Sequence, residues 1–164
     1  MQYKKNLGQH FLKDQNIVDK LVRYINPSQN DEIIEIGPGE GIMTKSIIKK
    51  VKKMILIEKD IDLIENLKNN FSEYNNSSII NIDFLKYNLG GLNKPMRIIG
   101  NLPYNISTEV IFKMCNCNKI IDMHFMLQKE VVDRIVAESN SKIYGRLSIM
   151  AQAYFNVKKL FDIS

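Results

Sequence analysis

Short apolar runs that alternate with amphipathic stretches are the feature of this sequence that most restricts its fold. The runs predicted as strands span residues 32–37, 53–58, 78–83, 96–101, 122–128 and 157–163. The stretches predicted as helices end near residues 25, 52, 71, 115, 136 and 155; the first precedes all the strands and the others lie between them. Strands that alternate with helices indicate parallel β-α units, and continuously apolar strands indicate a sheet covered on both faces. The sequence therefore predicts an α/β fold with a central, mostly parallel sheet.

The composition is typical of one soluble domain. Of the 164 residues, 45% are hydrophobic and 25% are charged. No apolar run approaches the roughly 18 residues of a membrane span, and the N-terminus lacks the apolar core of a signal peptide. We therefore expect a cytoplasmic protein without membrane contact, and a monomer. The net charge of +5 suits a polyanionic partner. Cys115 and Cys117 have no second cluster to complete a zinc site, so we expect no metal.

The first predicted strand ends in a glycine-rich turn. Ligands of parallel α/β sheets bind beyond the carboxyl ends of the strands, so this turn is a candidate site. It contains Glu35, Gly37, Gly39 and Gly41. Such a turn lets a ligand approach the backbone, although it can also be only a tight connection. Its G-x-G-x-G spacing disfavours a dinucleotide, and the lack of a P-loop lysine disfavours a nucleoside triphosphate.

Two carboxylates end the second and third predicted strands. Glu58 can accept hydrogen bonds from both hydroxyls of a ribose, or it can be an exposed acid that caps a helix. Asp83 can accept a bond from an adenine amino group while Phe84 covers the ring, or it can be a turn or cap residue. With the glycine turn, these residues outline a pocket for a nucleoside with a polar tail.

The fourth predicted strand ends in the sequence Asn101-Leu102-Pro103-Tyr104. Methyl transfer to an exocyclic amine such as adenine N6 needs positioning and acceptors that hold the N–H groups, rather than a strong base. The Asn101 side-chain oxygen and the Leu102 carbonyl are such acceptors, and Pro103 stiffens the turn. Tyr104 offers a face for stacking on the target base. A base inside a helix cannot reach such a site, so the substrate must be unpaired or flipped out.

These motifs together resemble the S-adenosylmethionine-dependent adenine N6,N6-dimethyltransferases of ribosomal RNA. The resemblance rests on E-I-G-P-G-E-G after the first strand, N-L-P-Y after the fourth, and L-G-Q-H-F-L at residues 7–12. The stretches FMLQKEVVDRIVA and SKIYGRLSIMAQ resemble the bacterial small-subunit branch. The resemblance implies a Rossmann-like methyltransferase domain over residues 1–164. It also implies a target of two adjacent adenines in a hairpin loop near the 3′ end of small-subunit RNA, each methylated twice.

The resemblance also implies a role for each candidate residue. Those placed against the cofactor S-adenosylmethionine are His10, Leu12, Glu35, Gly37, Gly39, Glu58, Asp83, Phe84 and Asn101. Glu58 would bind the ribose hydroxyls and Asp83 the adenine amino group, with the methionine portion along the glycine turn. Asn101 and Leu102 would hold the target N6 and Tyr104 would stack on the target adenine, with Pro103 in the same catalytic corner.

The chain departs from the family pattern after Ser164. The family continues with an F-x-P-x-P-x-V segment, a seventh strand between strands five and six, and a small helical C-terminal domain. We therefore expect a truncated catalytic domain that binds the cofactor but methylates ribosomal RNA poorly, and whose sixth strand lacks its ladder partner. Three alternatives stay open: a macrolide-resistance methyltransferase of large-subunit RNA, a non-catalytic RNA-binding or ribosome-assembly protein, and a dinucleotide-dependent oxidoreductase.

Overall fold

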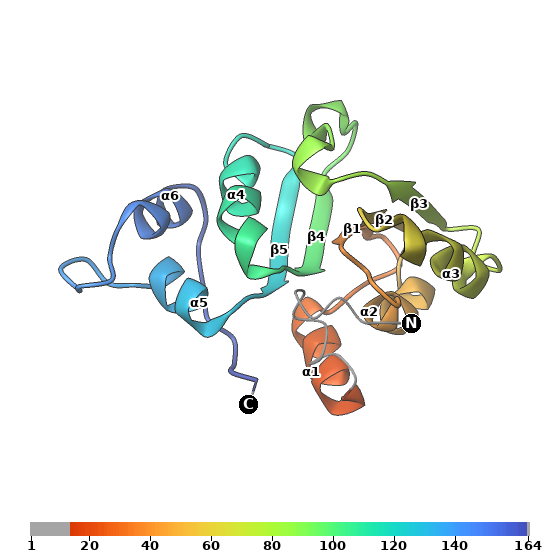
Figure 1. Cartoon of the computed structure of the whole chain (residues 1–164), viewed down its shortest axis with the longest axis horizontal. Coiled ribbons are helices and arrows are strands. Elements are labelled where there is room, and N and C mark those ends of the chain that lie inside the picture. The colour runs from red at the N-terminus through yellow and green to blue at the C-terminus, as the bar shows by residue number, and fades with distance from the viewer. Residues whose placement is uncertain (1–13, 164) are drawn as a thin grey trace.

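Five parallel strands form one sheet in the computed structural model, which describes residues 14–163, in the order β3-β2-β1-β4-β5 (Figure 1). The strands are β1 (Glu32–Ile36), β2 (Lys53–Glu58), β3 (Ser77–Asn81), β4 (Met96–Asn101) and β5 (Ile120–Met126). The helices are α1 (Gln15–Ile25), α2 (Ile42–Ile47), α3 (Ile61–Phe71), α4 (Tyr104–Met114), α5 (Lys129–Ile135) and α6 (Arg146–Tyr154). The predicted α/β fold with a parallel sheet is therefore confirmed.

Both faces of the sheet are buried at its three central strands, β1, β2 and β4, which explains why these strands read as continuous apolar runs. On one face, Ile33 and Ile99 belong to a core cluster with residues of α1, α2 and α3. On the other, Ile34 and Ile98 belong to a second cluster with α4 and the short turns that follow β3. A third, smaller cluster packs α5 and α6 against α4. None of the helices between residues 14 and 163 has the length and apolar character to cross a membrane.

Local signals in the sequence set the helix ends. Asp14, predicted to begin the first helix, accepts a hydrogen bond from the Asn16 amide at 2.8 Å, and Asp60 does the same for the Asp62 amide at 3.1 Å at the start of α3. Such caps satisfy amide groups that a helix start leaves without partners. At the other end of α1, Asn26 takes a left-handed conformation with φ 46°.

A buried ion-pair cluster joins the amino ends of β4 and β5 to the loop before β1. Arg97 is 8% exposed, and its guanidinium contacts Asp122 through two hydrogen bonds of 2.8 and 2.9 Å. It also donates to Asp31 at 2.6 Å and to the Ile25 carbonyl at the end of α1. A two-pronged guanidinium–carboxylate pair is among the strongest protein hydrogen-bond arrangements. The cluster therefore fixes α1 against the sheet at the edge opposite the predicted site.

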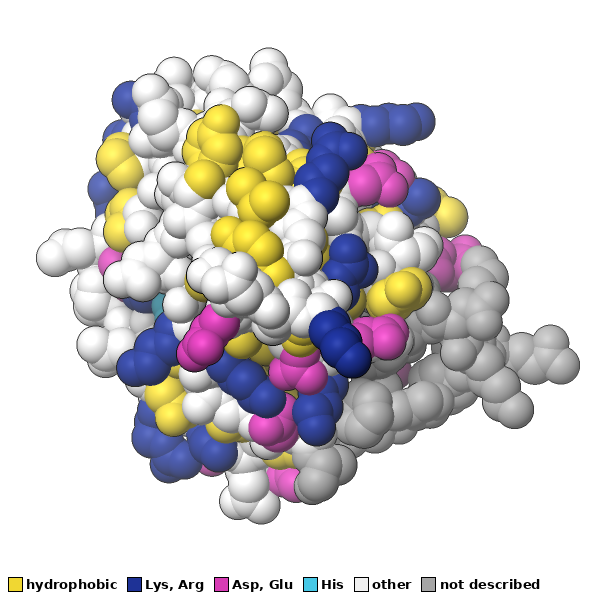
Figure 2. All heavy atoms as spheres, turned by 90° about the vertical axis from the view of Figure 1, so that its left-hand side faces the viewer, with side chains coloured by type: hydrophobic (Ala, Val, Ile, Leu, Met, Phe, Trp, Pro, Cys, Tyr) yellow, Lys and Arg dark blue, Asp and Glu magenta, His cyan; other side chains and the backbone are white. Residues whose placement is uncertain are grey.

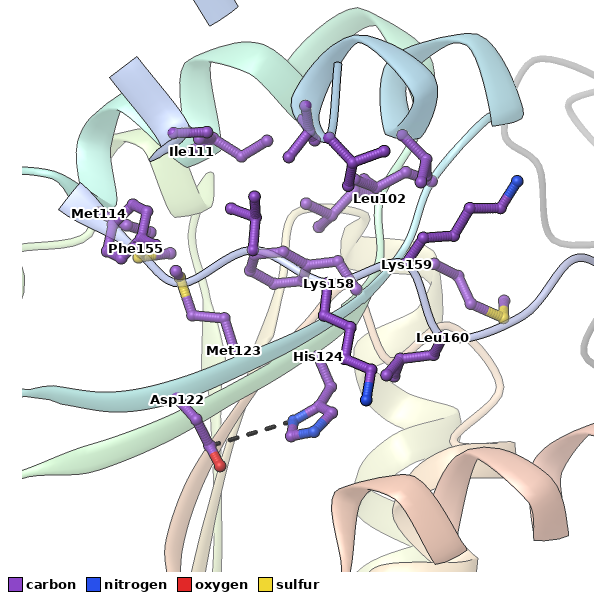
Figure 3. A pocket seen from close by; sticks show the side chains of 18 of the residues that line it. Leu102, Ile111, Met114, Asp122, Met123, His124, Phe155, Lys158, Lys159 and Leu160 are labelled. Atoms are coloured by element: carbon purple, nitrogen blue, oxygen red, sulfur yellow. Dashed lines mark ion pairs between the residues drawn. The ribbon is translucent and has the colours of Figure 1, made fainter. Parts of the chain in front are cut away.

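The strand predicted at residues 157–163 is wrong. The segment is extended, and its side chains alternate strictly between half-buried (Val157, Lys159, Phe161) and exposed (Lys158, Asp162), but it pairs with no other strand of the described chain. A groove of about 1910 Å³ separates it from the free edge of β5, and Figure 3 shows side chains from both sides lining it. Without a neighbouring strand, the segment has the side-chain period of a β-strand but no ladder hydrogen bonds.

The side of the molecule that carries α6 exposes several hydrophobic side chains, as Figure 2 shows. Three large ones on α6 or in the loop before it are more than half exposed: Ile143, Ile149 and Tyr154. Nearby, Ile121 on the β5 edge is 62% exposed. Several exposed apolar side chains thus lie on α6, in the loop before it and on the β5 edge, while Ile61 on α3, at 64%, is exposed elsewhere on the molecule.

Candidate functional site

The carboxyl ends of the strands bring the candidate residues together. Ile36 of β1 pairs with Ile57 of β2 on one side and with Gly100 of β4 on the other. Neighbouring strands lie about 4.8 Å apart, so the glycine turn after β1 sits between Glu58 and Asn101. The chain order reverses here, because β2 and β3 extend to one side of β1 and β4 and β5 to the other. Such a switch point is where open α/β sheets bind ligands.

The glycine turn needs its glycines for two different reasons. Gly37, Gly39 and Gly41 have φ values of 62°, 60° and 79°, a region that residues with a Cβ rarely adopt. A Cβ at Gly37 would have no atom within 4 Å, whereas a Cβ at Gly41 would lie 2.4 Å from the Phe71 ring. Gly37 thus leaves open space for a ligand, and Gly41 permits close packing of the turn on α3.

Glu58 is buried, not exposed, so the interpretation of this residue as an exposed acid is wrong. Its side chain accepts hydrogen bonds from the Gly39 amide at 3.1 Å and from the Asp60 amide at 2.9 Å, and the residue is 6% exposed. The carboxylate therefore ties the glycine turn to the end of β2. A ribose would share oxygens that are already held in place by the backbone.

Glu35 lies beneath the glycine turn and is 1% exposed. The Thr44 hydroxyl on α2 donates to it at 2.5 Å. Burial raises the pKa of Glu35, the Thr44 hydrogen bond lowers it, and the negative charge of Glu58 raises it, to about 7. The floor of the site thus holds an acid that exchanges its proton near neutral pH.

Asp83 lies two residues beyond β3 and caps a short turn, Phe84–Lys86. Its oxygens accept from the Leu85 amide at 3.0 Å and from the Lys59 ammonium at 2.7 Å, so the cap interpretation is confirmed. The hydrogen bond from Lys59 is the main reason why the pKa of Asp83 is lowered. Phe84 is 3% exposed within the second core cluster, which leaves a ligand only its rim and main chain.

The corner after β4 is held rigidly on both sides. The Leu102 amide donates to the Met126 carbonyl at the end of β5 at 3.0 Å, and the Ser107 hydroxyl donates to the Pro103 carbonyl at 2.9 Å. The following helix begins at Tyr104, four residues earlier than the Thr108 start that the sequence predicts, because Pro103 serves as its N-cap residue. The Tyr104 side chain is 55% exposed and so is accessible for stacking.

Three residues that shape the site were not among those predicted from the sequence. Thr44 orients Glu35, Lys59 pairs with Asp83, and Gly100 allows β4 to approach β1, because a Cβ there would lie 2.9 Å from the Ile36 carbonyl. A polar residue on the apolar stripe of α2 was the available signal for Thr44. The predicted cofactor residues His10 and Leu12 lie outside the described residues.

Comparisons with known proteins identify the family. The family model described as ribosomal RNA adenine dimethylase matches residues 1–163. This chain belongs to that family. The adenine dimethylase family is the one that the motifs of the sequence predicted, so that prediction is confirmed.

Individual relatives agree with the family model. The chain is 50% identical to the ribosomal RNA small subunit methyltransferase A of Wigglesworthia glossinidia brevipalpis, with 98% of this chain and 63% of the relative covered. It is similar to a dimethyladenosine transferase from Plasmodium falciparum, with a TM-score of 0.77 and 30% identity over 87% of this chain and 52% of that one. The 23S rRNA methyltransferase ErmE, at 23% identity and a TM-score of 0.69 over 86% of this chain and 55% of that one, shares the fold. The chain thus spans less than two thirds of the length of these proteins.

Proposed function

We propose that this chain carries the catalytic site of an S-adenosylmethionine-dependent methyltransferase that dimethylates N6 of adenines in small-subunit ribosomal RNA. The observation that carries the proposal is the juxtaposition, at one sheet edge, of the open glycine turn, the buried Glu58 and the Asn101–Tyr104 corner. Small-subunit RNA is preferred over large-subunit RNA because the relative at 50% identity is named for the small subunit. The pair of adjacent adenines in a hairpin loop near the 3′ end is the proposed target.

The residues at the strand ends fit the cofactor. Gly37 leaves space beside the backbone for the methionine portion, and the carboxylate of Glu58 can accept from ribose hydroxyls while Gly39 and Asp60 hold it in place. Asp83 has the chemistry to accept from an adenine amino group, in competition with Lys59. When bound, S-adenosylmethionine supplies a methyl group activated by a positively charged sulfur.

The corner after β4 would hold the target base. The Asn101 side-chain oxygen and the Leu102 carbonyl would accept the two N6 hydrogens and favour a tetrahedral nitrogen, while the exposed ring of Tyr104 would stack on the adenine. No strong base is needed, because the N6 proton becomes acidic only once the new bond to nitrogen forms. The hydrogen bonds that hold Leu102 and Pro103 in place supply the rigidity that such positioning requires.

We propose that the part of the protein that this chain covers, which spans 63% of the relative's length, binds the cofactor. The protein would act as a monomer in the cytoplasm and without a metal ion.

The test is transfer of labelled methyl groups to unmethylated small-subunit particles. Asn101→Ala should abolish transfer, and Asn69→Ala, an exposed asparagine on α3, serves as the matched control. Transfer that survives in Asn101→Ala would refute the proposed role of the corner. Particle binding without any transfer by the unaltered chain would instead favour a role in ribosome assembly.

A further inference from the structure

Glu35 occupies a position where a carboxylate has apolar neighbours within the sheet. Its register partners are Leu56 of β2 and Ile99 of β4, and both are fully buried. The side chain points to the sheet face that α2 covers, where Thr44, itself 0% exposed, donates its hydroxyl at 2.5 Å. A β-branched side chain in a helix has few rotamers, so Thr44 holds this geometry at little entropic cost.

The charge that faces Glu35 is negative. Glu58, from the end of β2, raises the pKa of Glu35, and α2 contributes the Thr44 hydroxyl rather than a cation. Within residues 14–163, none of the ion pairs includes Glu35. A buried carboxylate that lacks a cation retains its proton to a higher pH than an exposed one. Burial therefore raises the pKa of Glu35 to about 7, well above that of an exposed carboxylate.

A positively charged ligand above the glycine turn would favour the ionised form of Glu35 over the protonated form. A nearby cation favours the charged form of a carboxylate and lowers its pKa. By linkage, the ionised carboxylate must then bind the cation more tightly than the protonated carboxyl does. S-adenosylmethionine carries a sulfonium and an ammonium group against a single carboxylate, so the ligand of the proposed function is a net cation.

We propose that Glu35 releases its proton to solvent when the cationic cofactor binds, and that Thr44 is the positioning residue that stabilises the ionised carboxylate. The inference rests on the proposed function, because it concerns the same cofactor site. The exchange is balanced: the Glu35 O–H bond breaks, the proton passes to water or buffer, and the carboxylate left behind faces the bound cation. Cofactor affinity therefore falls as the pH drops below neutrality.

Isothermal titration of the 164-residue chain with S-adenosylmethionine tests the proton release. Binding is measured at pH 6, 7 and 8, in two buffers with different heats of ionisation, for the unaltered chain and for Glu35→Gln. The glutamine variant keeps the shape but cannot titrate, so the ratio of the two affinities cancels the titration of the ligand and of other groups. Between pH 6 and pH 8, this ratio should change about tenfold in favour of the unaltered chain.

Two substitutions at Thr44 separate positioning from mere packing. Thr44→Val keeps the volume but removes the hydrogen bond that lowers the pKa of Glu35. The fall in affinity should then begin at a higher pH, whereas Thr44→Ser should follow the unaltered chain. A purely structural role would weaken binding by the same factor at each pH.

The outcomes distinguish this inference from the proposed function. Affinities of the unaltered chain and Glu35→Gln that run parallel from pH 6 to pH 8 would overturn the proton link and leave the cofactor site intact. Absence of binding at every pH would overturn both proposals. If Thr44→Val does not fold, Thr44→Ser still tests the role of the hydroxyl. Its cofactor affinity is compared across the pH range with that of the unaltered chain and of Glu35→Gln. A pH dependence unlike that of the unaltered chain would count against the role of the hydroxyl.

Discussion

Replacing Gly41 with alanine should destabilise the protein more than the same change at Gly37, although both glycines have positive φ. The backbone strain of an alanine in this region costs about 1–2 kcal/mol at either position. At Gly41 the new Cβ would also lie 2.4 and 2.7 Å from two atoms of the Phe71 ring, which is 4% exposed and packed with Leu67. Overpacking of this kind adds about 1–3 kcal/mol. The loss should therefore total about 2–5 kcal/mol for Gly41→Ala and about 1–2 kcal/mol for Gly37→Ala.

Urea unfolding, monitored by circular dichroism, measures both losses of stability. If the dependence of the unfolding free energy on urea concentration keeps the same slope, only the stability has changed. A second measurement, binding of S-adenosylhomocysteine, should give the opposite order, because the Cβ at Gly37 enters the space left for the ligand. Each variant is thus the control for the other. If Gly41→Ala loses no more stability than Gly37→Ala, the contact with Phe71 does not limit this position and the reasoning fails.

Four other outcomes are expected. Arg97→Met should cost about 3–5 kcal/mol in the free energy of unfolding, because it leaves partly buried carboxylates without their partner. Lys94→Met, which breaks an exposed pair, should change the same quantity by less than about 1 kcal/mol. Although burial raises the pKa of Asp31, hydrogen bonds from Ser28 and Arg97 outweigh it and lower that pKa, so the stability that Asp31 contributes is complete above its unfolded pKa and is lost as the pH falls through the folded one. An acid titration of unfolding checks the sign: the dependence should be weaker in Arg97→Met, which keeps only the hydrogen bonds with Ser28. In methylation assays, Tyr104→Ala should raise the KM for RNA about tenfold and Tyr104→Phe should not, because stacking needs the ring alone; equal KM values would exclude stacking.

The sequence predicted the sheet well because apolar runs record burial on both faces, which only a covered parallel sheet provides. It failed at residues 157–163 because a period of two records which side chains are exposed and says nothing about a partner strand. The sequence predicted the start of α4 too late, at Thr108, because Pro103 is equally compatible with a turn. The structure shows that Leu102 is hydrogen-bonded to the end of β5 and that α4 begins two residues later, at Tyr104.

At the site, local spacing located the glycine turn and the acids, but not what holds them. The bond from Thr44 to Glu35 and the pair between Lys59 and Asp83 join separate elements, and such contacts follow from the packing of α2 and the loop after β2. The sequence also left two interpretations of Glu58 open, and only its burial in the folded structure excludes the exposed acid.

The central position of β1 has a consequence for how the chain is made. Ile33 pairs with Met54 on one side and with Arg97 on the other, so the first partner strand leaves the ribosome well before the second. Strands β1, β2 and β3 can pair on the nascent chain before β4, the second partner of β1, has been synthesised. Closure of that edge is a distant pairing, which is slow compared with local ones. Until β4 has been synthesised, the apolar central strand β1 therefore has one edge without its native partner.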